Sequence, residues 1–365
     1  MYEGDFPPIQ QRLMEFIRRR FQPGYNHYNV SKLVGDASSR QYYRYVTDSG
    51  ARYILAAYPE PFDPDRFPFG QVYELLRLIG VPVPKIHEID GPLGIVLQQD
   101  LGNVSLQKKL MAAAPPARIL LLREAMDHLV RIQSEGSSRF SPSCEGFHLA
   151  FDEKKLTWEL RFFRRFYLEK YRGRPAGAED EMDAEFVRIA RELAAYPRVL
   201  CHRDYHVRNL MHCRHKLYVI DFQDARWGPF TYDVVSLLKD SIDLEASEID
   251  SLLEHYLSRI QAGRRPAVRL ALSDEGSRPA AATEKAWLES FEAPLFKRQF
   301  NVMSIQRLLK ALGTYAYQIK VRENFIYEQY MAGSLNRTRI SLDAVDDFPL
   351  IRSIVEDELG RKSTA

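Results

Sequence analysis

The chain has 365 residues, of which 45% are apolar and 27% are charged, and its formal net charge at pH 7 is +2. This length allows two lobes with their own cores, and the nearly balanced charge gives no reason to expect nucleic acid or an anionic membrane as a partner. No apolar run approaches the ~18 residues of a membrane span. Three cysteines are too few for a disulfide framework and favour a reducing, cytoplasmic location.

The first part of the chain predicts a helix followed by a β-hairpin. Apolar residues in 9–21 recur with helical spacing. Residues 28–46 favour two strands around the tip V-G-D-A-S-S, whose glycine and small polar side chains suit a loop with backbone N–H groups close to phosphate. We therefore assign Ser38 and Ser39 to nucleotide binding.

The next strand, residues 53–58, lacks the lysine with which protein kinases grip the α- and β-phosphates of ATP. Ala56 or Ala57 stands at the corresponding position. Arg40 and Arg44 share one face of the preceding strand, because side chains alternate along a strand. One of them is expected to supply the missing charge. The alternatives are that both are exposed strand arginines or that metal and backbone alone hold the phosphates.

Residues 94–98 predict a strand that stops at Q-D-L-G-N. A strand that breaks at such a sequence is typical of a hinge, where backbone groups are free to meet an adenine edge. We assign Gln99 and Leu101 to this contact. The boundary is expected here, between a nucleotide-binding lobe (1–102) and a catalytic and substrate-binding lobe (103–365).

The strongest pattern in the chain is His202-Arg203-Asp204, followed after four residues by Asn209 and then by an apolar run that ends at Asp221. Phosphoryl transfer from ATP needs a carboxylate that orients the acceptor hydroxyl and takes its proton, and oxygen ligands for Mg²⁺ on the phosphates. Asp204 fits the first role. Asn209 and Asp221 fit the second.

A hairpin is expected to bring these metal ligands together. If residues 210–211 pair with 217–220, with 212–216 as the turn, Asp221 comes to lie beside Asn209.

A second support is expected from the helix predicted over 232–242. Asp233 near its start is placed to accept hydrogen bonds from the catalytic-loop backbone and so to fix Asp204, and we assign His202 and Arg203 together with it to the support of this loop.

Zinc binding is an alternative interpretation of the same stretch, because it is rich in Cys and His. The candidates are Cys201, His202, His206, His212, Cys213 and His215. Structural zinc sites usually contain closely paired ligands. The two cysteines here lie about a dozen residues apart, which favours the magnesium interpretation.

The acceptor is expected to bind between two helices, residues 152–171 and 296–317. The first is rich in aromatic residues, which suit either core packing or a sugar face, and it contributes Glu159 and Arg161 as candidates. The second carries a polar stripe that includes Arg307. Between them, residues 262–285 are rich in Gly, Pro and charge and predict an exposed loop.

These stretches resemble the aminoglycoside phosphotransferase and choline kinase superfamily. They are most similar to its anomeric sugar kinases of peptidoglycan recycling, which phosphorylate N-acetylmuramate and N-acetylglucosamine at carbon 1. The resemblance lies in four segments, G-D-A-S-S-R-Q-Y-Y-R (35–44), G-V-P-V-P (80–84), D-F-Q-D-A-R-W-G-P-F-T-Y-D-V-V-S-L-L (221–238) and M-S-I-Q-R-L-L-K-A-L-G (303–313). Gln98-Gln99-Asp100 departs from the more common Leu-Glu-Asp, and 262–285 resembles an insertion.

The resemblance implies an α+β, two-lobed, protein-kinase-like fold, with a small β-rich N-lobe and a larger, mainly helical C-lobe. It also implies ATP and Mg²⁺ as cofactors, Asp204 as the base, and Asn209 and Asp221 as metal ligands. We add Asp224, from the D-F-Q-D run, to the substrate-binding candidates.

The predicted function is that of an ATP-dependent phosphotransferase with an alcohol group as acceptor, most plausibly the anomeric hydroxyl of an N-acetylated amino sugar. The Arg- and Lys-rich acceptor side favours a neutral or anionic sugar over a cationic aminoglycoside or choline. A non-catalytic pseudokinase is the alternative suggested by the missing lysine. Retention of Asp204, Asn209 and Asp221 argues against it. The sequence fixes neither the acceptor nor the oligomeric state.

Overall fold

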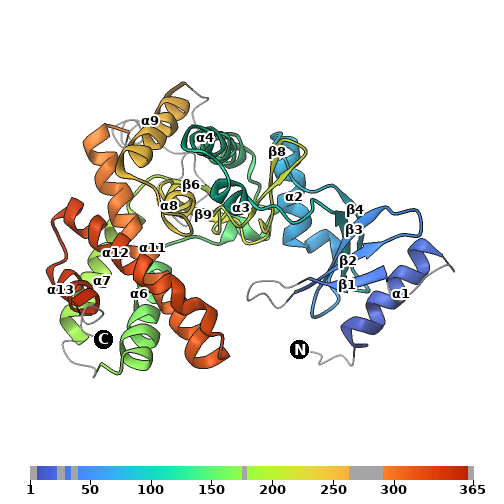
Figure 1. The fold of residues 1–365 in the computed structure, drawn as a ribbon, viewed down its shortest axis with the longest axis horizontal. Coiled ribbons are helices and arrows are strands. Elements are labelled where there is room, and N and C mark those ends of the chain that lie inside the picture. Colours follow the sequence, from blue (N-terminus) through green and yellow to red (C-terminus); the bar gives the residue numbers. More distant parts are fainter. Residues whose placement is uncertain (1–5, 23–28, 34–39, 175–178, 263–290, 361–365) are drawn as a thin grey trace.

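The computed structural model describes residues 6–22, 29–33, 40–174, 179–262 and 291–360. Figure 1 shows a small part built on a sheet and a larger, mainly helical part, so the expected α+β division is confirmed. The sheet has five antiparallel strands in the order β1-β2-β3-β5-β4. Its elements are α1 (Ile9–Phe21), β1 (Val30–Lys32), β2 (Gln41–Val46), β3 (Arg52–Ala57), α2 (Pro68–Leu78), β4 (Ile86–Asp90) and β5 (Ile95–Gln99).

The two faces of the sheet are buried against different partners, because side chains alternate along each strand. On β3, Leu55 and Ala57 pack with the apolar face of α1 in a small separate core. Ala56 points the other way and joins the main core, which includes α2 and extends into the helical part. The small lobe is therefore packed directly onto the large one.

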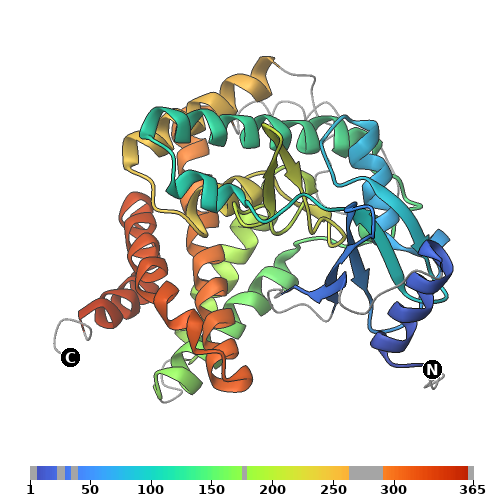
Figure 2. The same ribbon diagram turned by 45° about the vertical axis from the view of Figure 1, so that its right-hand side comes forward.

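The larger part consists mainly of helices around two short hairpin-like sheets (Figures 1 and 2). Its helices are α3 (Leu106–Met111), α4 (Pro115–Arg131), α6 (Glu153–Phe163), α7 (Glu179–Ala194), α8 (Tyr232–Lys239), α9 (Ala246–Ala262), α11 (Ala293–Arg322), α12 (Glu328–Val345) and α13 (Pro349–Gly360). Its strands are β6 (Arg198–Cys201), β7 (Leu210–Cys213), β8 (Lys216–Val219) and β9 (Arg226–Pro229). In the described ranges, no helix combines the length and apolar composition needed to cross a bilayer.

The long helix α11 runs through the centre of this part and is largely buried, including its polar residues Gln306 and Arg307. Gly313 allows its close approach to α6, because a Cβ there would lie 2.8 Å from the backbone Cα of Phe163. The polar stripe predicted on this helix therefore lies inside the protein, next to the catalytic loop.

Three predicted boundaries are corrected. The hairpin exists, but β7 and β8 continue until only Arg214 and His215 remain as the turn, both with positive φ (48° and 63°). Such a two-residue turn matches the strand twist and usually contains Asn or Gly, which the sequence does not provide. The helix predicted over 232–242 ends at Lys239. Helix α6 changes into a π-helical stretch at Arg164–Tyr171.

We propose that the lobe boundary lies at residue 102. Strand β5 ends at Gln99, and Gly102 has a φ of +84°, which glycine adopts without strain. The insertion expected at 262–285 lies almost entirely outside the described residues.

Candidate active site

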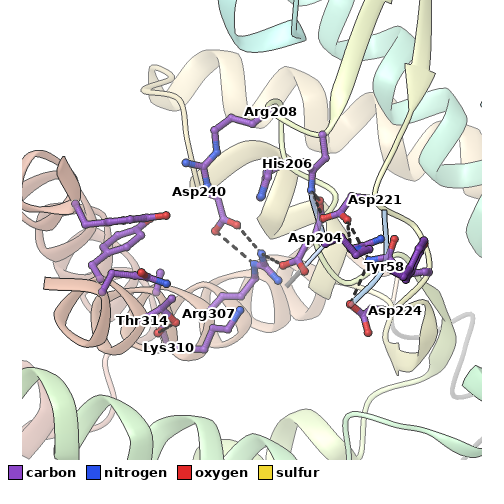
Figure 3. Close-up of a pocket in the computed structure, with 17 residues that line it drawn as sticks. Tyr58, Asp204, His206, Arg208, Asp221, Asp224, Asp240, Arg307, Lys310 and Thr314 are labelled. Atoms are coloured by element: carbon purple, nitrogen blue, oxygen red, sulfur yellow. Dashed lines mark hydrogen bonds and ion pairs between the residues drawn. The ribbon is translucent and has the colours of Figure 1, made fainter. Parts of the chain in front are cut away.

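A cavity of about 520 Å³ lies where the catalytic loop, the loop after β8 and helix α11 meet (Figure 3). It is lined by six of the residues predicted for the site, Arg40, Asp204, Asn209, Asp221, Asp224 and Arg307. The structure thus brings together residues that are up to 267 positions apart in the sequence, from Arg40 to Arg307.

The catalytic loop is held by Asp233, as the sequence predicted. The Asp233 carboxylate accepts hydrogen bonds from the backbone N–H of His202 at 2.6 Å and of Arg203 at 3.1 Å. Arg203 has a φ of +85°, which a side chain with a Cβ rarely adopts. The hydrogen bonds that these N–H groups donate to a fully buried carboxylate make this conformation available, and it turns the chain so that Asp204 faces the cavity.

The two predicted metal ligands lie side by side. Asn209 Nδ2 donates to the backbone oxygen of Asp204 at 3.0 Å and lies 3.4 Å from Asp221 Oδ2. The backbone N–H of Ile220 donates to Asn209 O at 3.0 Å, which joins the loop after β8 to the catalytic loop. Asp221 has a φ of +65°, so its backbone also adopts a constrained conformation.

These side chains fit Mg²⁺. Asn209 donates through Nδ2, so its Oδ1 remains an acceptor, and the Asp221 carboxylate lies next to the same side-chain amide. Magnesium prefers such oxygen ligands and commonly uses one or two protein side chains together with substrate phosphates. The zinc candidates do not gather. Cys201 is buried and donates through Sγ to Pro229 O. Within the described residues no group of three or more His, Cys, Asp and Glu is arranged to hold a metal ion.

The cavity keeps Asp204 ionised. Burial by itself would raise the pKa of Asp204, but the positive charges of Lys310, Arg203 and Arg307 outweigh it and hold that pKa well below its usual range. Asp204 is therefore a carboxylate over the whole physiological range, ready to accept a hydrogen bond from an acceptor hydroxyl.

Arg307, predicted as a substrate contact, is instead used almost completely by the protein. Its side chain is only 3% exposed. The guanidinium donates to Arg203 O at 2.9 Å, to Ser236 Oγ at 2.8 Å and to the Asp240 carboxylate, and it lies 4.0 Å from Asp204. This contact ties α11 and the end of α8 to the catalytic loop.

The two candidate phosphate-binding arginines have different surroundings. Arg40 faces the cavity, 2.8 Å from Asp221 Oδ1. Arg44 forms two hydrogen bonds to Asp100, whose side chain is 1% exposed, and does not line the cavity.

The other nucleotide-binding candidates remain predictions. Ser38 and Ser39 lie outside the described residues. Leu101 is buried, and the Gln99 backbone N–H donates to Lys85 O at 2.8 Å. Neither Gln99 nor Leu101 lines the cavity, although both lie at the end of β5 where the lobes join.

Two substrate candidates lie elsewhere. Glu159 is 2% exposed and accepts a hydrogen bond from Gln306 at 2.9 Å. Arg161 forms a two-pronged ion pair with Asp183 on α7. Neither lines the cavity. Both positions share a helical face with aromatic residues, but only the packing of α6 against α11 and α7 shows which side of the helix each one occupies.

Sequence reasoning included Lys310 in the polar stripe of this helix, but it missed Thr314, Tyr315 and Gln318, which line the α11 side of the cavity together with Tyr327. Helical spacing on α11 was the only available clue. It also missed Arg208 and His206, which lie inside the H-R-D-x-x-x-x-N motif at positions the motif leaves open.

An ionised carboxylate, an adjacent amide and carboxylate, and an arginine meet here between a sheet lobe and a helical lobe, and these are the kinds of group that phosphoryl transfer requires. The comparison with protein families agrees. The chain belongs to the phosphotransferase enzyme family, whose pattern matches residues 29–270. Membership implies ATP as the phosphoryl donor.

Characterised relatives share about 30% of the sequence. The chain is 30% identical to the N-acetylmuramate/N-acetylglucosamine kinase of Neisseria meningitidis serogroup B, over 79% of this chain and 78% of the relative. It is 32% identical to the enzyme of the same name from Pseudomonas aeruginosa, over 77% of this chain and 74% of the relative.

Solved structures share the fold. A choline/ethanolamine kinase family protein from Mesorhizobium loti has a TM-score of 0.55 at 13% identity, covering 92% of this chain and 95% of that one. Amicoumacin kinase hAmiN, in complex with AMP-PNP, Ca²⁺ and Ami, has a TM-score of 0.51 at 14% identity, covering 91% of this chain and 95% of that one. The protein-kinase-like fold predicted from the sequence is thereby confirmed.

We predict that Arg40 takes the role of the missing lysine. Arg40→Ala should raise the Michaelis constant for ATP several-fold, because a cation facing the phosphates is lost. Arg44→Ala is the matched comparison. It should mainly lower the melting temperature. Among the described residues, the remaining cationic partner of the buried Asp100 carboxylate is then Arg52, which lies farther away, at 3.5 Å. The assignment is wrong if the two variants change the Michaelis constant equally, or if Arg40→Ala binds ATP like the parent.

The pH profile should respond to Lys310. Since its positive charge lowers the pKa of Asp204, Lys310→Met should raise that pKa and move the acidic limb of kcat/KM to higher pH. Lys297→Met is a control on the same helix, because Lys297 pairs with Asp250 away from the cavity. An unshifted acidic limb in Lys310→Met would show that Lys310 does not act on the base.

Proposed function

We propose that this phosphotransferase moves the γ-phosphoryl group of ATP to the anomeric hydroxyl of an N-acetylated amino sugar, N-acetylmuramate or N-acetylglucosamine. The observation that carries the proposal is that relatives with this activity in their names match over more than three quarters of the chain. Asp204, the proposed base, opens onto a cavity large enough for a monosaccharide beside the groups proposed to bind phosphate.

The charge of the cavity agrees with a neutral or anionic acceptor. Its four aspartates are Asp204, Asp221, Asp224 and Asp240. Each of the last three has an arginine partner within 3.0 Å. Asp204 is surrounded by positive charge. A cationic aminoglycoside or choline needs uncompensated carboxylates at this place, and the cavity offers hydroxyl, amide and cationic groups instead.

In the proposed reaction Asp204 accepts a hydrogen bond from the anomeric hydroxyl and orients its oxygen towards the γ-phosphorus. As the new O–P bond forms and the bond to the ADP oxygen breaks, the hydroxyl proton passes to Asp204 and then to solvent. A carboxylate with a low pKa is a weak base, so the reaction benefits from an acidic acceptor. The anomeric hydroxyl is more acidic than the other hydroxyls of a sugar.

Asn209 and Asp221 are proposed to hold Mg²⁺, which would neutralise charge on the transferred phosphates. Arg40, 2.8 Å from Asp221, lies close enough to this position to contact a phosphate oxygen. Asp233 and Arg307 act on the reaction indirectly by fixing the loop that carries Asp204.

Substitution of Asp204 and Asp221 should separate the base from the metal ligand. Asp204→Asn and Asp221→Asn should each lower kcat by orders of magnitude. Only Asp221→Asn should also raise the concentration of free Mg²⁺ needed for half-maximal activity, because only it weakens the metal site. Circular dichroism checks that both variants are folded. A folded Asp204→Asn variant with near-normal turnover would remove Asp204 from the reaction.

The acceptor atom can be tested with a reducing sugar and its methyl glycoside, which differ only in the free hydroxyl at carbon 1. With N-acetylglucosamine, Mg²⁺ and ATP, we expect ADP release, and with methyl N-acetylglucosaminide we expect none. Equal phosphorylation of both compounds would assign another hydroxyl. Release of ADP with neither reducing sugar of the proposed pair would contradict the amino-sugar assignment.

A further inference from the structure

The charges that line the cavity are unevenly compensated. Asp221 pairs with Arg40, Asp240 with Arg307, and Asp224 with Arg203, all within 3.0 Å. Two further cations line the cavity, Arg208 and Lys310. In the part of the chain that the structure describes, neither has a carboxylate within 4.0 Å.

Among the described residues, Arg208 has an aromatic ring as its neighbour rather than a carboxylate partner. It precedes Asn209 in the catalytic loop, and in Figure 3 it extends from this loop to the side of the cavity away from Asp224. Its Nε is buried and has no hydrogen-bond partner among the described residues. Its guanidinium carbon lies 6.0 Å from the centre of the Tyr330 ring.

The aromatic support of Arg208 continues into the cavity wall. The Tyr330 ring contacts those of Tyr315 and Tyr327, which stack on each other with centroids 5.6 Å apart and line the cavity. The charge of a cation against an aromatic face is not neutralised by a counter-charge and its N–H donors stay available, whereas a cation paired with a carboxylate has its charge compensated and its donors occupied. The Arg208 guanidinium thus lies beside the cavity with N–H donors that are available to a ligand.

The positive charge of Arg208 acts on another residue of the cavity, His206. Burial and, after it, the positive charge of Arg208 lower the pKa of His206 to about 4. His206 is therefore neutral at physiological pH and does not compete with Arg208 for an anion. On the opposite wall, Lys310 adds a second positive charge.

We infer that Arg208 is the residue that selects a carboxylate-bearing sugar as acceptor, with Lys310 contributing to the same positive field. The inference rests on the proposed function and goes beyond it, because it divides the two proposed acceptors. N-acetylmuramate differs from N-acetylglucosamine by a lactyl ether that carries a carboxylate. A planar guanidinium can bind such a group through two parallel hydrogen bonds.

The test compares the two sugars in Arg208→Gln and Arg208→Lys. The ratio of kcat/KM for N-acetylmuramate to that for N-acetylglucosamine should fall at least about tenfold in Arg208→Gln, as expected for loss of a charge-assisted hydrogen bond. Most of the fall should come from the Michaelis constant for N-acetylmuramate. Arg208→Lys should fall between parent and Arg208→Gln. Arg188→Gln is the matched control, because Arg188 pairs with Asp347 on the surface.

Equal losses for both sugars would overturn the inference, since they would place Arg208 at the phosphates or in the fold. An unchanged ratio would overturn it as well.

The parent enzyme gives a second measurement that does not depend on folded variants. Raising the salt from about 0.05 to about 0.5 M should increase the Michaelis constant for N-acetylmuramate more than that for N-acetylglucosamine, because salt screens the ion pair. Equal salt dependence would contradict a carboxylate contact. Absence of phosphorylation of either sugar by the parent would instead refute the proposed function itself.

Discussion

The site depends on one buried carboxylate. Asp233, at the start of α8, accepts the backbone N–H groups of His202 and Arg203 and so holds the catalytic loop in a conformation that includes a φ of +85°. A backbone of this kind is unstable without partners for its buried polar groups. Because α8 is itself fully buried, the loop is anchored to the core of the large lobe. The direction of Asp204 follows from this anchor.

Charged side chains also hold the catalytic loop and act on Asp204. Arg307, from a helix about a hundred residues further along the chain, reaches the same loop and shares its charge between Asp240 and Asp204. A buried arginine is costly unless its donors are satisfied, and here the backbone of Arg203, Ser236 and Asp240 satisfy them. The same positive charge keeps Asp204 ionised. Stability of the helical lobe and readiness of the base are therefore coupled.

A site of this kind divides its cations between two tasks. Arg307 pairs with Asp240 inside the protein, and Arg40 lies against the proposed metal ligand Asp221. Arg208 is held by an aromatic ring and has no carboxylate within ion-pair distance among the described residues. Cations of the first kind shape the catalytic centre, whereas a cation of the last kind is available to a ligand. This division links the charge pattern of the cavity to the choice of acceptor.

The sequence by itself determined the parts of the protein that depend on local spacing. The H-R-D-x-x-x-x-N motif, the strand that leads to Asp221, and Asp233 all lie within a stretch short enough for loop and hairpin geometry to bring them together. The tertiary structure alone decided the rest. Helical periodicity placed Glu159 and Arg161 beside aromatic residues and Arg307 on a polar stripe. Only the packing of α6 and α11 showed that Glu159 is buried, that Arg161 pairs with Asp183, and that Arg307 reaches the catalytic loop. Such long-range contacts depend on how whole helices pack. The local pattern of residues does not determine which element packs against each face of a helix.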